Sequence, residues 1–279
     1  MLDTWQIALV PVLAFLCEYV DSTLGMGYGT TLTPLFMLLG YSPMQIVPVI
    51  LLSELATGIS AAVCHHREGN VNFMPKSTTF STVVAKLNTL GYVESFRRGI
   101  PIHLKVALLL GICSVVGTVV AVFVAINVPK FWLKLYIGVI VLAMGVVILA
   151  CMNKEFSFSW RKLSVLGVVA SFNKGLSGGG YGPIVTCGQI LSGVEGRSAV
   201  GITSLAEALT CLVGVLCYIM VTKGALDWRL APYVIIGAML SVPLSAKSVK
   251  VITARKLKLA IALLTIVLGA YTIYKTVNP

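Results

Sequence analysis

Apolar stretches long enough to cross a lipid bilayer recur along the whole chain, from about residue 5 to residue 276. Only 11% of the residues are charged, against about a quarter in an average soluble domain. A chain so poor in charge cannot cover a water-facing surface, and in hydrocarbon each backbone polar group needs a partner within the protein. The composition therefore predicts an all-α polytopic membrane protein, placed in the inner or plasma membrane of the cell.

Polar residues, glycines and prolines divide the apolar sequence into about ten segments. We expect them at 5–21, 24–39, 43–64, 104–127, 133–151, 163–176, 180–193, 198–221, 230–249 and 257–276. The second, sixth and seventh have roughly 14–16 residues, fewer than the ~20 that a membrane-spanning helix needs. These three segments are expected to be half-helices or re-entrant hairpins.

The first half of the sequence recurs in the second half at a constant offset of 153 residues. LGMGYGTTLTPLFMLLG aligns without a gap with SGGGYGPIVTCGQILSG, and in the same register Glu54 matches Glu207. A shared G-Y-G, a second glycine and a glutamate in one register indicate an internal repeat. We therefore divide the chain into membrane repeats at 1–152 and 153–279, each with about five helical segments.

The distribution of basic residues predicts the topology. Of the 21 lysines and arginines, 15 fall on one face of the ten-segment arrangement. Cytoplasmic loops carry an excess of basic residues, so we assign this face to the cytoplasm, with a loop at about 66–103 on it and both termini outside. An odd number of crossings in each half then gives two inverted-topology repeats with broken glycine-rich helices, a plan found in secondary transporters.

The stretch NKGLSGGGYGP, residues 173–183, sets a lysine beside three successive glycines in a strongly apolar region. The glycines end the helix, and irregular backbone at membrane depth must be buried in protein or line an aqueous cavity. The next helix begins with free N–H groups and the positive end of its dipole, which favours an anion. The stretch predicts an anion site, with close helix packing at small residues as the alternative. The expected site residues are Asn173, Lys174, Ser177, Gly178, Gly179, Gly180 and Tyr181.

The first repeat contains a matching stretch, DSTLGMGYGTT, in which Asp21 occupies the position of Lys174. If the two breaks meet near the middle of the bilayer, Asp21 and Lys174 form an ion pair with which a substrate competes. Alternatively, Asp21 lies at a helix end and faces water. This half of the anion site is expected to include Gly25, Gly27, Tyr28, Gly29, Thr30 and Thr31.

Glu54 and Glu207 lie in the middle of apolar segments at matching positions of the two repeats. A carboxylate in the bilayer core is costly unless it is protonated or paired. Together with Asp21, the two glutamates are candidates for coupling or gating, with a proton as the candidate coupling ion. The alternative is that each glutamate is a hydrogen-bonded structural residue between helices.

Other chemistry finds little support in the sequence. The seven cysteines form no CxxC pair, and we expect neither a metal nor a cofactor. GLSG at 175–178 superficially matches the nucleophile motif of rhomboid-type intramembrane proteases, but no histidine follows His103 to act as its base. We expect no enzyme activity and no nucleic-acid partner, and both a monomer and a homodimer are compatible with the sequence.

The stretches DSTLGMGYGTTLTPLFMLLGYSP, LLSELATG, FNKGLSGGGYGP and AVGITSLAEALTCLVG resemble the TauE/SafE sulfite-exporter family. This resemblance implies a secondary transporter that exports small sulfur-containing anions such as sulfite or organosulfonates. It places the characteristic patches of the family at Gly25–Thr31 with Asp21 and at Asn173–Pro183. An uptake permease for another small anion or metabolite is the alternative. We expect Lys174→Ala to abolish transport while the fold stays largely intact.

Overall fold

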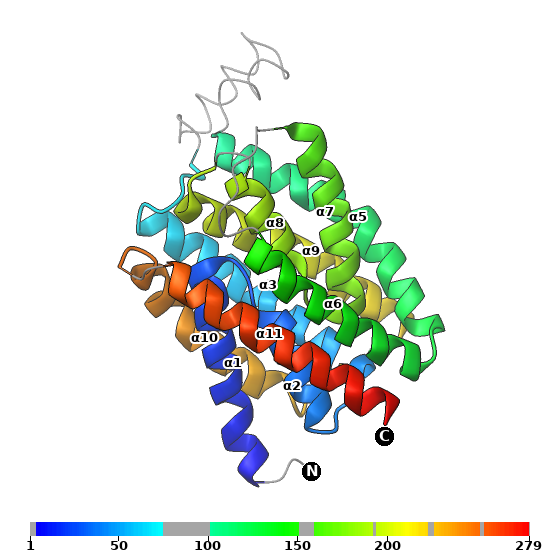
Figure 1. Cartoon of the computed structure of the whole chain (residues 1–279). Coiled ribbons are helices and arrows are strands. Elements are labelled where there is room, and N and C mark those ends of the chain that lie inside the picture. Colours follow the sequence, from blue (N-terminus) through cyan, green and yellow to red (C-terminus); the bar gives the residue numbers. More distant parts are fainter. Residues whose placement is uncertain are drawn as a thin grey trace.

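The computed structural model describes residues 4–74, 101–150, 159–191, 194–222, 226–251 and 254–278, and the regular structure in these ranges is entirely α-helical (Figure 1). The helices are α1 (Thr4–Leu24), α2 (Tyr28–Leu38), α3 (Pro43–Arg67), α5 (Ile102–Asn127), α6 (Lys130–Ala150), α7 (Trp160–Ser177), α8 (Tyr181–Leu191), α9 (Gly196–Val221), α10 (Ala231–Ser248) and α11 (Ala254–Val277). Each of the predicted apolar segments corresponds to one of these helices. The all-α prediction is confirmed.

The lengths of the helices agree with the predicted pattern in most places. The helices α3, α5, α6 and α9 are long and apolar enough to cross a membrane, judged by length and composition. The helices α2 and α8 have only 11 residues each, as expected for half-helices. The helix α7 is longer than predicted, at 18 residues, because it begins with the polar Trp160-Arg161-Lys162 that a hydropathy pattern leaves out. The predicted loop at 66–103 falls largely on residues 75–100, outside the described ranges.

The exposed and buried surfaces are distributed as in a membrane protein. Large apolar side chains of α5 lie on the outside, including Ile112 at 69% and Val116 at 62% exposure. The acidic and basic side chains of the predicted site lie inside, where Lys174 is 1% and Glu54 is 3% exposed. An apolar outside around a charged inside fits hydrocarbon as the surrounding medium.

The helices of the two halves pack in an exchanged order. The first helix of each half packs against the fourth helix of the other, α1 against α10 and α7 against α5, while α3 packs against α9 and α6 against α11. This exchange is what a two-fold relation between the halves produces. Both termini lie at one end of the molecule, and α5 and α7 begin at the opposite end (Figure 1). The inverted arrangement of the repeats in a bilayer and the side on which the termini lie stay predictions.

The two glycine-rich breaks contact each other backbone to backbone. The helix α7 is capped at its C-terminus by Gly178, whose φ of +72° is in the left-handed region that glycine adopts without strain. A Cβ atom on Gly29 would overlap the Gly178 carbonyl, and in the other half a Cβ on Gly182 would overlap the Gly25 carbonyl. Gly29 and Gly182 occupy equivalent positions of the predicted repeat, so each break packs against the other in the same way.

Side-chain hydroxyls join the two breaks across this contact. Thr30 accepts a hydrogen bond from the Gly180 amide at 3.0 Å, and Thr186 donates one to the Gly25 carbonyl at 2.6 Å. These bonds satisfy backbone groups that the helices leave free at their ends. The alternative that the glycines allow close packing therefore describes part of their role.

We predict that Gly29→Ala and Gly182→Ala each lower the free energy of unfolding by about 1–3 kcal/mol or more, because the added methyl overlaps backbone that cannot rotate away. The measurement is the unfolding temperature of the purified protein in detergent. The control is Gly196→Ala, where nothing lies within 4 Å of an added Cβ. Equal unfolding temperatures for all three variants would show that the breaks are not in contact.

Candidate functional site

Lys174 forms ion pairs with two carboxylates in the interior of the protein. Its Nζ lies 2.7 Å from Oε1 of Glu207 and also contacts Oε2 of Glu54. The lysine side chain is 1% exposed, and the glutamates are 4% and 6% exposed. The sequence singled out all three residues separately, and the structure brings them together from α7, α3 and α9.

Small residues on α3 and α9 explain why the two glutamates meet. A Cβ on Gly58 would lie 2.8 Å from the Ser204 carbonyl oxygen and 3.0 Å from Cβ of Ala208. This close approach lies one helical turn from Glu54 and beside Glu207, so both carboxylates point toward the same place.

The last turn of α7 is held in place by α5 and α9. The Tyr218 hydroxyl donates a hydrogen bond to the Gly175 carbonyl at 2.9 Å. On the other side, a Cβ on Gly175 would lie 2.9 Å from Cβ of Ala121 on α5. These contacts fix the backbone next to Lys174 and direct its side chain toward the glutamates.

The ion-paired cluster contains one more carboxylate than it has cations. In a low-dielectric interior such an imbalance is costly, and a proton on one carboxylate would remove it. The described residues offer no hydrogen-bond partner to Oε1 of Glu54, while Oε2 lies 3.8 Å from the Cys211 thiol. Glu54 therefore has an oxygen that can take up a proton without breaking another interaction.

Asp21 has a different partner from the one expected. Its carboxylate accepts a hydrogen bond from the Tyr28 amide, at 3.2 Å, and the ion pairs of Lys174 among the described residues are with Glu54 and Glu207. The predicted Asp21–Lys174 ion pair is therefore not formed. Tyr28 is the first residue of α2, so the anion-binding character predicted for this helix start is used by a carboxylate of the protein. Asp21 is 8% exposed, which also rejects the alternative that it faces water.

The remaining predicted residues surround these groups. The hydroxyl of Ser177 donates to the Asn173 carbonyl at 2.7 Å, and the Asn173 side chain accepts a bond from Tyr136 of α6. The Tyr28 hydroxyl lies 2.7 Å from the Ser53 hydroxyl. Other predicted residues that are buried around the two breaks are Gly25, Gly27, Gly29, Thr30, Thr31, Gly178, Gly179, Gly180 and Tyr181.

The sequence analysis missed Glu18, a buried carboxylate on α1 that is 2% exposed. Its Oε1 accepts a hydrogen bond from Ser22 at 2.5 Å, and Oε2 has no hydrogen-bond partner among the described residues. The available signal was its position three residues before Asp21, because this spacing places both acids on one helix face. Among the described residues, no group of three histidine, cysteine or acidic side chains could hold a metal ion.

Comparison with known proteins identifies the family of the chain. The family model described as "Sulfite exporter TauE/SafE" matches residues 10–77 and 73–272. The chain belongs to the TauE/SafE family. It is also similar to "Probable membrane transporter protein YtnM" of Bacillus subtilis (strain 168), with 26% identity over 249 residues, 84% of this chain and 71% of that protein. No solved structure matches. The TauE/SafE chain is thus a multi-pass membrane transporter and not an enzyme.

From the sequence, we expected the fold to stay largely intact when Lys174 is replaced. The two buried carboxylates beside Lys174 predict instead that its removal destabilises the protein. We predict that Lys174→Met lowers the free energy of unfolding by about 3–5 kcal/mol, because it leaves buried carboxylates without their cation. The triple variant Glu54→Gln, Lys174→Met, Glu207→Gln should recover most of this loss. The measurement is chemical unfolding of the purified protein at neutral pH.

Lys250→Met is the matched control, because Lys250 forms an exposed ion pair with Glu68 at 2.7 Å. The hydrogen bond and charge of Lys250 lower the pKa of Glu68, so the small stability from this pair is present above the ordinary pKa of glutamate. It is lost as the pH falls through the lowered pKa. This variant should have a free energy of unfolding close to that of the wild type. If Lys174→Met is no less stable than Lys250→Met, the buried cluster does not stabilise the fold.

Proposed function

We propose that this transporter exports small sulfur oxyanions, sulfite or organosulfonates, and that Lys174 is the cation that binds them. The observation that carries the proposal is a fully buried lysine beside two touching helix breaks, with two carboxylates as its partners. The substrate class is the one named in the family description. A compact oxyanion needs a positive charge and several convergent donors to replace its water. Lys174 supplies the charge, and Ser177, Thr30 and the amides of the breaks are donors that would exchange their present hydrogen bonds for bonds to the anion.

Binding of the anion requires competition with the glutamates. An oxyanion that takes the place of Glu54 or Glu207 at the lysine leaves that carboxylate buried without its cation. A proton from the aqueous side neutralises the carboxylate at lower cost than a free buried charge. Anion binding and proton uptake are thereby linked, and protons are the coupling ion in this proposal. Glu18 and Asp21 lie on α1 nearby, with Glu18 as a further proton acceptor.

The site lies where the two repeats meet, which is the arrangement needed if one repeat moves against the other during transport. Lys174 and its glutamates come from both repeats, and Thr30 and Thr186 join the breaks through single hydrogen bonds. Rocking of one inverted repeat against the other would open the interior alternately to the two sides, as in other transporters of this plan. Uptake of the anion into the cell is the alternative to export. The flux assay described next distinguishes the two directions.

The substrate is tested with purified protein in liposomes, by uptake and release of labelled sulfite, thiosulfate, sulfoacetate and sulfate. We expect saturable flux of at least one of the first three and its loss in the triple variant Glu54→Gln, Lys174→Met, Glu207→Gln, which we expect to stay folded. Saturable flux of a different anion alone would reject the proposed substrate class. Flux that persists in the triple variant would reject Lys174 as the binding residue.

Proton coupling is tested with Glu54→Gln and Glu207→Gln, each of which leaves a neutral Lys–Glu pair. We predict that both variants stay folded and exchange substrate, but respond less than the wild type to an imposed proton gradient, by tenfold or more. The control is Glu68→Gln, which removes an exposed carboxylate and should respond as the wild type does. An unchanged response in both buried variants would exclude these glutamates from proton transfer.

A further inference from the structure

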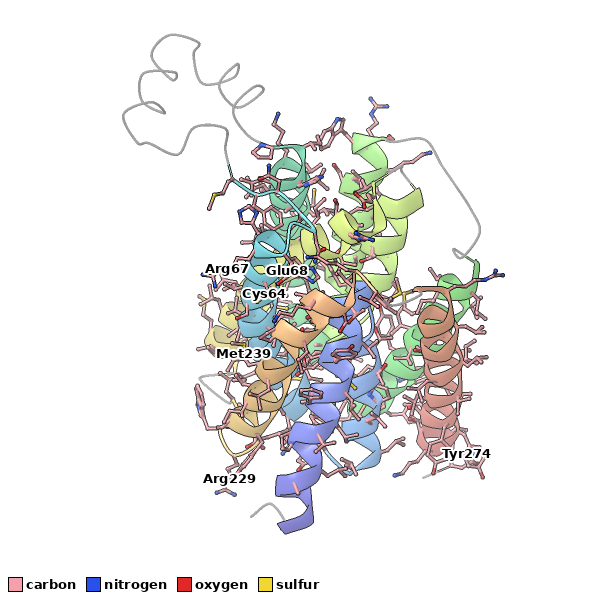
Figure 2. All side chains as sticks on the ribbon, turned by 90° about the vertical axis from the view of Figure 1, so that its left-hand side faces the viewer. Cys64, Arg67, Glu68, Arg229, Met239 and Tyr274 are labelled. Carbon is pink, nitrogen blue, oxygen red and sulfur yellow. The ribbon has the colours of Figure 1, made fainter. Side chains whose placement is uncertain are left out.

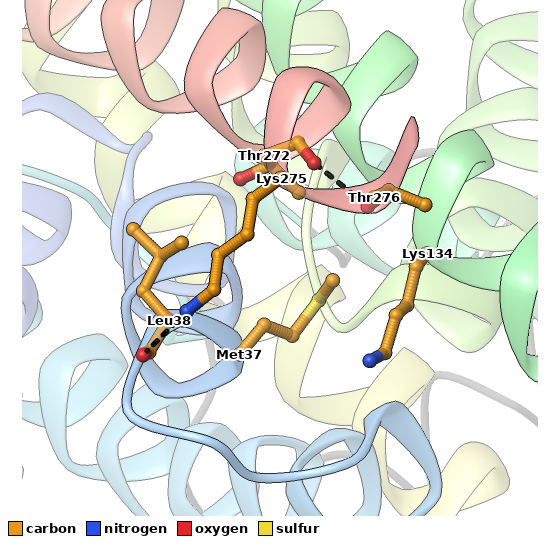
Figure 3. A pocket seen from close by; sticks show the side chains of 6 residues that line it. All are labelled: Met37, Leu38, Lys134, Thr272, Lys275 and Thr276. Carbon is orange, nitrogen blue, oxygen red and sulfur yellow. Dashed lines mark hydrogen bonds between the residues drawn. The ribbon is translucent and has the colours of Figure 1, made fainter. Parts of the chain in front are cut away.

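A small cavity lies between the ends of three helices, away from the central cluster. It has a volume of about 240 Å³ and is lined by Met37, Leu38, Lys134, Thr272, Lys275 and Thr276 (Figure 3). These residues come from the end of α2, the start of α6 and the end of α11. The cavity therefore lies at the end of the molecule that also carries the C-terminus (Figure 1).

The lining of this cavity carries two positive charges and no acidic side chain. Lys134 and Lys275 both line it, and Figure 3 shows their ammonium groups on either side of Met37. Among the described residues, the ammonium of Lys275 donates one hydrogen bond, to the Leu38 carbonyl at 3.2 Å, which leaves two of its three N–H groups for another acceptor. Two ammonium groups, with no carboxylate among the described residues that line the space, favour a bound anion.

A buried hydroxyl adds a third donor. Thr272 is 2% exposed and lines the cavity, and its Oγ1 has no hydrogen-bond partner among the described residues. A buried hydroxyl without a hydrogen-bond partner is costly, so an acceptor that reached Thr272 would stabilise the site. Thr272 and Lys275 lie three residues apart and share one face of α11.

Aromatic side chains place the cavity at the level of the lipid headgroups. Trp132 on α6 is 59% exposed, and Tyr271 and Tyr274 on α11 are 51% and 63% exposed. Figure 2 shows Tyr274 at the outer end of its helix. Tryptophan and tyrosine gather at the boundary between hydrocarbon and water. The two ammonium groups therefore lie at the depth where lipid phosphates are found.

We propose that Lys134, Lys275 and Thr272 form a second oxyanion site that binds a phosphate-type group. Its ligand is either the phosphate of an anionic lipid headgroup or a free oxyanion from solution. The chemistry is shared, because both present tetrahedral oxygens to two ammonium groups and one hydroxyl. The site is separate from Lys174 and does not depend on the transported substrate.

The test measures binding to the purified, delipidated full-length protein by its unfolding temperature. One arm adds inorganic phosphate, and the other adds phosphatidylglycerol in mixed micelles, with phosphatidylcholine as the zwitterionic comparison. We expect saturable stabilisation in at least one arm. Phosphate alone identifies a free oxyanion as the ligand, and phosphatidylglycerol alone identifies a lipid headgroup.

The variants are Lys134→Gln with Lys275→Gln, and Thr272→Val. The double variant should bind at least tenfold more weakly, and Thr272→Val severalfold more weakly. Lys250→Gln, which removes a lysine elsewhere, should bind as the wild type does. Should the double variant not fold, Lys134→Gln alone gives the same comparison, because Lys134 forms no hydrogen bond or ion pair with another described residue. The proposal is overturned if neither arm stabilises the wild type, or if the lysine variants retain wild-type affinity.

Discussion

A lysine buried in the interior of a membrane protein requires a compensating negative charge, and this requirement links much of the structure of this transporter. Lys174 obtains its partners from two different helices, one from each half of the chain. The helices α3, α7 and α9 must therefore converge at one point. Because a cation and its carboxylates interact strongly in a medium of low dielectric constant, any movement that separates them needs a replacement charge.

The glycine residues make this convergence possible. Gly58 lets α3 and α9 approach at the level of the glutamates, and Gly175 lets α7 pack closely on α5 just beside Lys174. The break after α7 then turns the chain into the short helix α8 beside the equivalent break of the first half. Packing and polar chemistry are therefore not alternatives here, because the same close approach both stabilises the fold and brings the charged groups together.

Much of this arrangement is visible in the sequence, because the bilayer restricts which residues a span can contain. Continuous apolar runs located the helices, glycine runs located the breaks, and Glu54 and Glu207 stood out as carboxylates in apolar segments. The sequence did not show which buried polar groups bind each other. Lys174 pairs with the glutamates and Asp21 binds an amide because of how helices pack, which an offset between two repeats does not encode. The sequence analysis missed Glu18 because the first apolar segment, 5–21, also contains Asp21, which was singled out by its alignment with Lys174.

The backbone contact at Gly29 also restricts how this sequence can evolve. Gly29 faces Gly178 and Gly179, so no neighbour can become smaller to make room for a side chain at this position. A substitution there cannot be rescued by a second change in the partner, whereas a large residue at an ordinary core position often can. Gly182 faces the main chain of Gly25 and Met26 and is restricted in the same way. Substitution of glycine by any larger residue is therefore disfavoured at both positions, whichever anion the protein transports.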